Sequence, residues 1–174
     1  MKFVASLAMI AALAGPAAAA TSSEARLTAV EDRLAINQLV GGDYVRALDG
    51  RHWDDYAATF TEDGQLAVFG TTMNGRAGIL KFFNTPGKAP PPADPQHRIL
   101  HVISDLSYRI DGDHASGGAY WEDVGLAPNG FPSVVSAGHY EDELRKEGGR
   151  WKFSKRTIVT EVQPIAPAAP QAAK

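Results

Sequence analysis

Three residues of types that carry out acid–base and electrostatic chemistry stand out in this sequence: Asp49, His101 and Arg156. Asp49 ends one helical pattern and precedes another, so its carboxylate can point between two helices. His101 lies in the middle of a strand pattern, with Ile99 and Ile103 at the same parity. A carboxylate bonded to one imidazole nitrogen fixes the tautomer and leaves the other nitrogen as a general base. The hypothesis therefore requires Asp49 and His101 to be adjacent in space.

Each of these residues also has a purely structural interpretation. Asp49 fits an ordinary Asp-Gly turn. His101 fits a core histidine whose ring is satisfied by the backbone or by a tyrosine hydroxyl. Arg156 fits a pocket cation for a developing anion or a leaving group, and it equally fits a cross-strand ion pair with Glu141 or Glu143. The sequence leaves both interpretations open for all three.

Five aromatic residues are candidates to line a binding pocket for a ring-containing or otherwise apolar ligand. They lie in the helical region and in the middle strands: Tyr44, Trp53, Tyr56, Tyr120 and Tyr140. The hydroxyl of Tyr44 or Tyr56 can donate a hydrogen bond to a carbonyl or a leaving group. The alternative is that these rings are core, as aromatic residues on strands usually are.

The sequence offers no pattern for a metal ion or a cofactor. His97 and His101 on one strand lie about 13 Å apart, too far to share an ion. The chain contains no cysteine. We find neither a glycine-rich phosphate loop nor the pattern around a serine or cysteine nucleophile. We therefore expect cofactor-independent chemistry.

The elements that position these residues are helices first and strands afterwards. Helical spacing of apolar residues predicts helices over 24–48, 52–60 and 77–83, with Gly41-Gly42 kinking the first or permitting close packing. A turn over 61–64 and a strand over 65–69 separate the second and third helices. After a proline-rich loop over 85–96, period-two patterning predicts antiparallel strands over 97–110, 115–124, 133–146 and 150–162. This order predicts an α+β fold, with the helices on one face of a curved sheet.

Strict alternation along the strands assigns each side chain to a face. In the first long strand it groups His101 with Ile103 and places Leu106 on the opposite face. In the last strand it places Arg156 opposite Trp151 and Phe153. Which face lines the pocket is left open.

The two ends of the chain differ in composition from the middle. An apolar stretch that ends at Ala18-Ala19-Ala20 predicts a signal peptide over 1–20. We expect one exported domain over 21–163, periplasmic or secreted, and a flexible Pro/Ala-rich tail over 164–174. The formal net charge of −3 and the lack of a basic run argue against nucleic acid or an anionic membrane as a partner.

Taken together, these elements resemble the SnoaL-like group of the nuclear-transport-factor-2-like (NTF2-like) superfamily. The similarity runs from about 25 to 162 and rests on Tyr44, Asp49, His101 and two short motifs, Gly75-Arg76 and Gly149-Arg-Trp151. The resemblance implies a cone of strongly curved, mostly antiparallel sheet that three N-terminal helices close around a pocket. It also implies self-association into dimers or trimers.

Within that group the chain is similar to hexachlorocyclohexane dehydrochlorinase and, more distantly, to scytalone dehydratase. The similarity implies that His101 abstracts a proton and that Asp49 holds the His101 ring and stabilises its charge. It also implies that Arg156 lines the pocket. We therefore expect a cofactor-free lyase or isomerase that acts on a small apolar substrate, of dehydratase or dehydrohalogenase type. The alternative is an exported domain that binds a small hydrophobic ligand without turnover.

Overall fold

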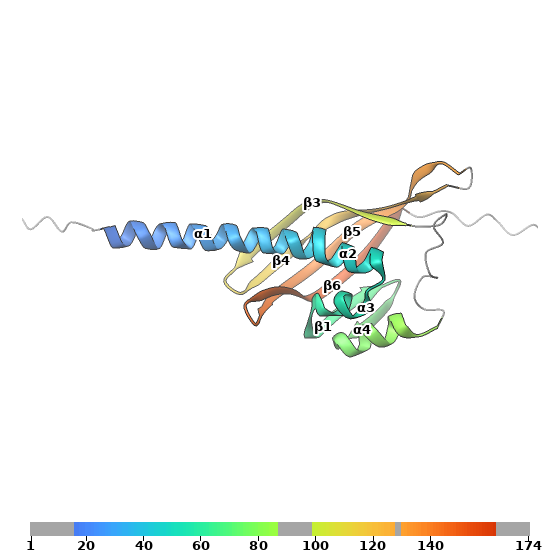
Figure 1. The fold of residues 1–174 in the computed structure, drawn as a ribbon, viewed down its shortest axis with the longest axis horizontal. Helices are drawn as coiled ribbons and strands as arrows, with labels where there is room; N and C mark the ends of the chain where they lie inside the picture. The colour runs from blue at the N-terminus through green and yellow to red at the C-terminus, as the bar shows by residue number, and fades with distance from the viewer. Residues whose placement is uncertain (1–15, 87–98, 128–129, 163–174) are drawn as a thin grey trace, which may run out of the picture.

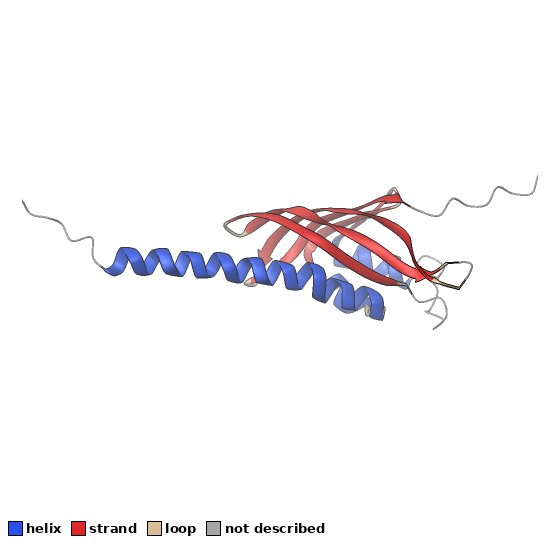
Figure 2. Cartoon of the chain, turned by 90° about the horizontal axis from the view of Figure 1, so that it is seen from above, coloured by secondary structure: helices blue, strands red, loops and turns tan. Residues whose placement is uncertain are grey.

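The fold is a layer of helices on one face of a curved, six-stranded sheet, as the α+β prediction requires (Figures 1 and 2). The computed structural model describes residues 16–86, 99–127 and 130–162. The strand order is β2-β1-β6-β5-β4-β3, so the sheet is open and β2 and β3 are its edges. All pairs are antiparallel except β1 with β6, which is parallel. Within the described residues, no helix is both long and apolar enough to cross a membrane.

The first helical region is divided by a π-helical turn. It consists of α1 (Pro16–Gln38), the π-helix η1 (Leu39–Asp43) and α2 (Tyr44–Gly50). The predicted break at Gly41-Gly42 lies in η1, but a Cβ on Gly41 would meet nothing within 4 Å, so this glycine does not serve close packing. After α2, Arg51 adopts a left-handed conformation with φ 56°, and the chain turns into α3 (Trp53–Ala58).

The short elements that follow differ from the prediction. Strand β1 (Phe60–Val68) includes 61–64, which were predicted as a turn. A Cβ on Gly64 would lie 2.8 Å from the carbonyl oxygen of Phe153, so glycine here permits close approach to β6. Strand β2 (Thr71–Asn74) was not predicted, because four mostly polar residues give no periodic signal. Helix α4 (Gly75–Asn84) begins two residues before its predicted start.

The four long strands form the predicted antiparallel meander. They are β3 (Leu100–Asp111), β4 (His114–Leu126), β5 (Pro132–Glu147) and β6 (Arg150–Val162). The start of the predicted first strand, most of the proline-rich loop, the tail and most of the predicted signal peptide lie outside the described residues.

A β-bulge in β3 corrects the predicted faces of that strand. Between Ser104 and Ser107, β3 has two residues where β4 has one, and Asp105 has φ 48°. The extra residue shifts the alternation, so Leu106 packs against the core on the same side as His101. The prediction that Leu106 faces the other way was wrong for this reason.

A second bulge, in β6, corrects the predicted face of Arg156. Leu144 pairs with Phe153 and Glu143 with Lys155, so the residue between the two, Ser154, has no partner of its own. Arg156 therefore joins Phe153 on the inner face, and both side chains are fully buried. Strict alternation had placed them on opposite faces.

Helix α1 runs beyond the sheet at one end and is tied to it near its middle (Figure 1). The indole Nε1 of Trp151 donates to Asp32 Oδ1 at 2.9 Å, and Lys146 Nζ lies 2.9 Å from the same oxygen. Beyond this contact, Ile36, Val40 and Tyr44 continue along the chain as buried core. The N-terminal helix and the last hairpin thus hold the two layers together.

Candidate active site

Asp49 and His101 are in direct contact, although 52 residues separate them in the sequence. Asp49 lies at the end of α2 and His101 near the start of β3. His101 Nδ1 is 2.6 Å from Asp49 Oδ1, and the backbone N–H of His101 donates to the same oxygen at 3.4 Å. Their side chains are 16% and 22% exposed, respectively, so one edge of the pair is open to solvent. The required adjacency is present, and the catalytic role of the pair stays a prediction.

A second carboxylate, Asp123, lies on the other side of the imidazole. Asp123 is directly opposite His101 in the register of β3 and β4, and its Oδ1 is 3.3 Å from His101 Nε2. Among the described residues, this buried oxygen has no hydrogen-bond partner. Its other oxygen, Oδ2, accepts a hydrogen bond of 2.5 Å from Ser136 Oγ. His101, Asp123 and Ser136 thus form one row across β3, β4 and β5.

Asp123 was not among the predicted site residues, although the sequence carries a signal for it. Asp123 has the same parity as Trp121, which is buried on the inner face of β4. Likewise Asp142 has the parity of Tyr140 and Leu144, which are both buried. A carboxylate at an apolar parity requires a buried partner, and this marks it as unusual.

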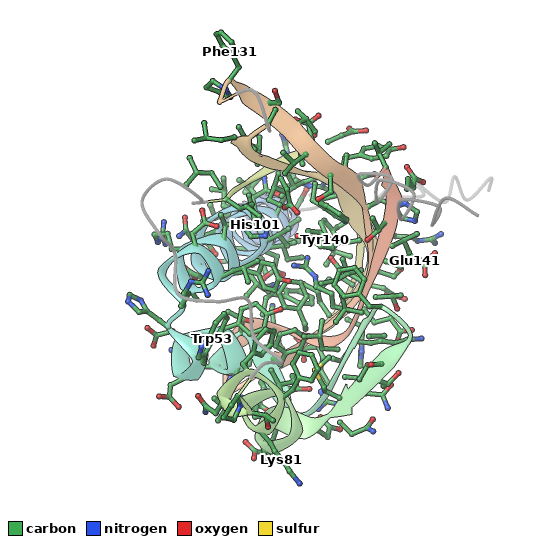
Figure 3. All side chains as sticks on the ribbon, turned by 90° about the vertical axis from the view of Figure 1, so that its right-hand side faces the viewer. Trp53, Lys81, His101, Phe131, Tyr140 and Glu141 are labelled. Carbon is green, nitrogen blue, oxygen red and sulfur yellow. The ribbon has the colours of Figure 1, made fainter. Side chains whose placement is uncertain are left out.

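Arg156 is paired with Asp142, not with Glu141 or Glu143 as the structural alternative held. Its Nε and Nη2 donate to the two Asp142 oxygens at 2.8 and 2.7 Å. Glu141 points away from the interior on the outer side of β5 (Figure 3). Burial opposes the charge of Arg156, but Asp142 outweighs burial and raises the pKa of Arg156 well above its usual value.

Arg156 is also enclosed by three aromatic rings. Its guanidinium carbon lies 3.9 to 4.2 Å from the ring centroids of Tyr44, Tyr140 and Phe153. The remaining nitrogen, Nη1, is buried and has no hydrogen-bond partner among the described residues. Arg156 is bonded to Asp142, and His101 contacts Asp49 and Asp123, so these two predicted residues belong to neighbouring clusters.

Three of the five predicted binding aromatics lie in this buried interior. Tyr44 and Tyr56 are at most 1% exposed, and their hydroxyl oxygens are 2.9 Å apart, so one hydroxyl donates a hydrogen bond to the other. Tyr140 is 3% exposed and points into the space between helices and sheet, toward the side where His101 lies (Figure 3). Burial, followed by the neighbouring Tyr44, raises the pKa of Tyr140 well above its usual value, and Asp123 adds to the rise. Its hydroxyl therefore stays protonated.

The structure does not bring the other two aromatics to His101. Trp53, on α3, stacks on Phe83 with ring centroids 4.4 Å apart. Tyr120 is 52% exposed on the outer face of β4, where it meets the ring of His139. An open surface depression of about 490 Å³ beside Trp53 contains neither Asp49 nor His101. It is lined by Arg51, His52, Trp53, Asp54, Asp55 and Asn84.

In the parts of the chain that the structure describes, no three His, Asp or Glu side chains are arranged to hold a metal ion. The side chains that contact His101 are the carboxylates of Asp49 and Asp123. Groups of these types can accept and donate protons.

The curved sheet with its helical layer is the NTF2-like fold. A solved NTF2-like protein with a cystatin-like fold from Novosphingobium aromaticivorans superposes with a TM-score of 0.68 at 21% identity, over 79% of this chain and 87% of that one. A family model for the SnoaL-like domain matches residues 28–157, so the chain belongs to the SnoaL-like family.

Two further structures are similar at higher sequence identity. LinA, a hexachlorocyclohexane dehydrochlorinase, has a TM-score of 0.65 at 25% identity, over 84% of this chain and 99% of LinA. A putative aromatic ring hydroxylase from Novosphingobium aromaticivorans has a TM-score of 0.61 at 30% identity, over 76% of this chain and 91% of that one. No curated protein matches the sequence.

Proposed function

We propose that this protein is a cofactor-independent lyase or isomerase that removes a carbon-bound proton from a small, largely apolar substrate. The single observation that supports the proposal most is the 2.6 Å contact between Asp49 and His101 Nδ1. With the Nδ1 proton held by Asp49, the Nε2 lone pair is the base. The similarity to LinA, a dehydrochlorinase at 25% identity, supports the same class of reaction.

In the proposed reaction, the C–H bond breaks and its proton goes to His101 Nε2. Asp49 stabilises the imidazolium that forms. The electron pair left on carbon forms a double bond as a leaving group departs, or it forms an enolate that is reprotonated elsewhere. Tyr140 is a hydroxyl that can stabilise developing negative charge, because burial raises its pKa and keeps it protonated. The guanidinium of Arg156 adds positive charge behind the Tyr140 ring.

Proton abstraction can be tested without knowledge of the natural substrate. Cyclohexanone in D₂O exchanges its α-protons when a base removes them, and NMR follows this exchange. We expect the protein to accelerate the exchange and His101→Ala to lower the rate at least about 10²-fold, the contribution of a positioned base. The control is His52→Ala, because the His52 side chain is 68% exposed and its ion-pair partner is Asp55.

Asp49→Asn should also slow the exchange, because an amide does not stabilise imidazolium as a carboxylate does. Equal exchange rates in wild type and His101→Ala would contradict the proposal. If cyclohexanone instead binds saturably in both proteins without exchange, the chain is a binding domain for small hydrophobic ligands.

We also propose that the protein is exported, on the sequence of residues 1–20. Mass spectrometry of the protein recovered from the periplasm or the medium should give a mature N-terminus near Thr21. A full-length protein retained in the cytoplasm would contradict export and would leave the proposed chemistry intact.

A further inference from the structure

The two inward-facing carboxylates in the middle of the sheet are satisfied to different degrees. Both oxygens of Asp142 accept hydrogen bonds, from Arg156 and from the Tyr108 hydroxyl. Asp123 has one bonded oxygen and one buried oxygen, Oδ1, without a donor among the described residues. A buried carboxylate oxygen without a donor is costly for the folded state, which points to a role other than stability.

The unpaired oxygen lies beside the base nitrogen. Asp123 Oδ1 and His101 Nε2 are 3.3 Å apart and form no hydrogen bond with each other. With Nδ1–H directed at Asp49, Nε2 presents a lone pair, so two acceptors lie side by side. A ligand that places a C–H at Nε2 and a donor on the neighbouring atom would satisfy both acceptors.

We propose that Asp123 selects a substrate with a hydroxyl group on the carbon next to the one that loses the proton. This inference rests on the proposed function and narrows it to elimination of water. The hydroxyl donates a hydrogen bond to Asp123 Oδ1, while the adjacent C–H faces His101 Nε2. A carbon-bound halogen has no proton to donate, and a departing halide would carry its charge away between the carboxylates of Asp49 and Asp123.

The elimination balances without any further reactant. The C–H proton goes to Nε2, and the C–H electron pair forms the C=C bond. The C–O pair leaves with oxygen, which takes the proton back from Nε2. Water departs and His101 returns to its neutral form, so Asp49 and Asp123 keep their charges throughout. Both transfers use one nitrogen, so proton and hydroxyl leave from the same side of the substrate.

The experiment uses two unreactive probes of similar shape, cyclohexanol and chlorocyclohexane. Their dissociation constants are measured by NMR from the shifts of the His101 ring signals in the purified protein. We expect wild type to bind cyclohexanol about tenfold more tightly, because a hydrogen bond to a charged acceptor contributes about 1.5 kcal/mol. A purely apolar site would prefer the chlorinated probe.

Two variants at Asp123 test the residue itself. Asp123→Leu removes the acceptor and should reverse the preference. Asp123→Asn keeps an oxygen for Ser136 and turns the amide N–H toward Nε2, and it should abolish the preference with little change in the fold. Glu122→Gln is the control, since Glu122 is the exposed neighbour on β4.

Equal binding of the two probes, preferred binding of chlorocyclohexane or no binding of cyclohexanol to wild type would overturn this inference. None of these results bears on cyclohexanone exchange, which tests His101 as a base. The two proposals can therefore fail separately.

Discussion

At the scale of single residues, buried charge in this protein is of two kinds. The Arg156 guanidinium is held by a bidentate carboxylate and three rings, as expected of a group that must stay charged in the core. The imidazole of His101 lies instead between two carboxylates at a partly open edge. The first cluster fixes the core, and the second holds the proposed base.

This distinction makes a prediction about Asp142. Asp142→Ala leaves Arg156 buried with no carboxylate, and it should lower the free energy of unfolding by about 3–5 kcal/mol. Urea unfolding followed by circular dichroism measures the loss. Its neighbour Glu141 lies on the outer side of β5 (Figure 3). Glu141→Ala should change stability by less than about 0.5 kcal/mol. Similar losses of unfolding free energy in both variants would show that Asp142 does not stabilise the buried Arg156.

At the scale of elements, the β-bulges decide which side chains reach the interior. Asp105 is a non-glycine residue with φ 48°, a conformation that glycine adopts without strain. We expect Asp105→Gly to raise the unfolding free energy by up to about 1 kcal/mol. Asp105→Val should lower it by about 1–3 kcal/mol, because a β-branched residue is strained there.

Urea midpoints of the two variants at pH 7 measure this difference. The NMR signals of His101 should be unchanged in Asp105→Gly, because the bulge begins after the pairing of His101 with Asp123. If the Val variant is as stable as the Gly variant, Asp105 does not adopt the left-handed conformation in solution.

The bulges also explain what the sequence could and could not predict. The spacing of hydrophobic residues predicted the long strands to within one or two residues over the described chain. It also placed Asp49 at a helix end. It failed for Leu106 and Arg156, because each follows one unpaired residue that reverses the alternation, and such a residue has no compositional signal. Asp123 and Asp142 could have been identified from the sequence, since simple parity puts both among buried residues. The partner of Arg156 depends on cross-strand register, which parity alone does not give.

At the scale of the whole molecule, the site depends on segments that are far apart in the chain. His101 meets a carboxylate from α2 on one side and one from β4 on the other, so the distance between the helical layer and the sheet sets the geometry. Asp32, on α1, contacts Trp151 and Lys146 across more than 100 residues of sequence. This contact holds the two layers at their distance.

The last prediction concerns the pH dependence of that contact. Burial raises the pKa of Asp32, but hydrogen bonds from Lys146 and Trp151 outweigh it, and the net pKa is lowered. Ionised Asp32 therefore stabilises the fold at neutral pH, and this contribution is lost as the pH falls through the lowered pKa. Asp32→Asn should lower the free energy of unfolding by about 1 kcal/mol at pH 7. The difference in stability from wild type should vanish once the pH falls below the lowered pKa of Asp32.

Asp113→Asn is the matched control, because Asp113 contacts the same Lys146 at 3.7 Å with a side chain that is 74% exposed. It should change stability by less than about 0.5 kcal/mol at any pH, since an exposed pair contributes little. Thermal unfolding of the three proteins at pH 7 and at low pH measures both effects. If Asp32→Asn is still less stable than wild type at low pH, then packing and not charge holds α1 against the sheet. If Asp113→Asn lowers the stability by the same amount, the loss of stability comes from Lys146 itself and not from Asp32.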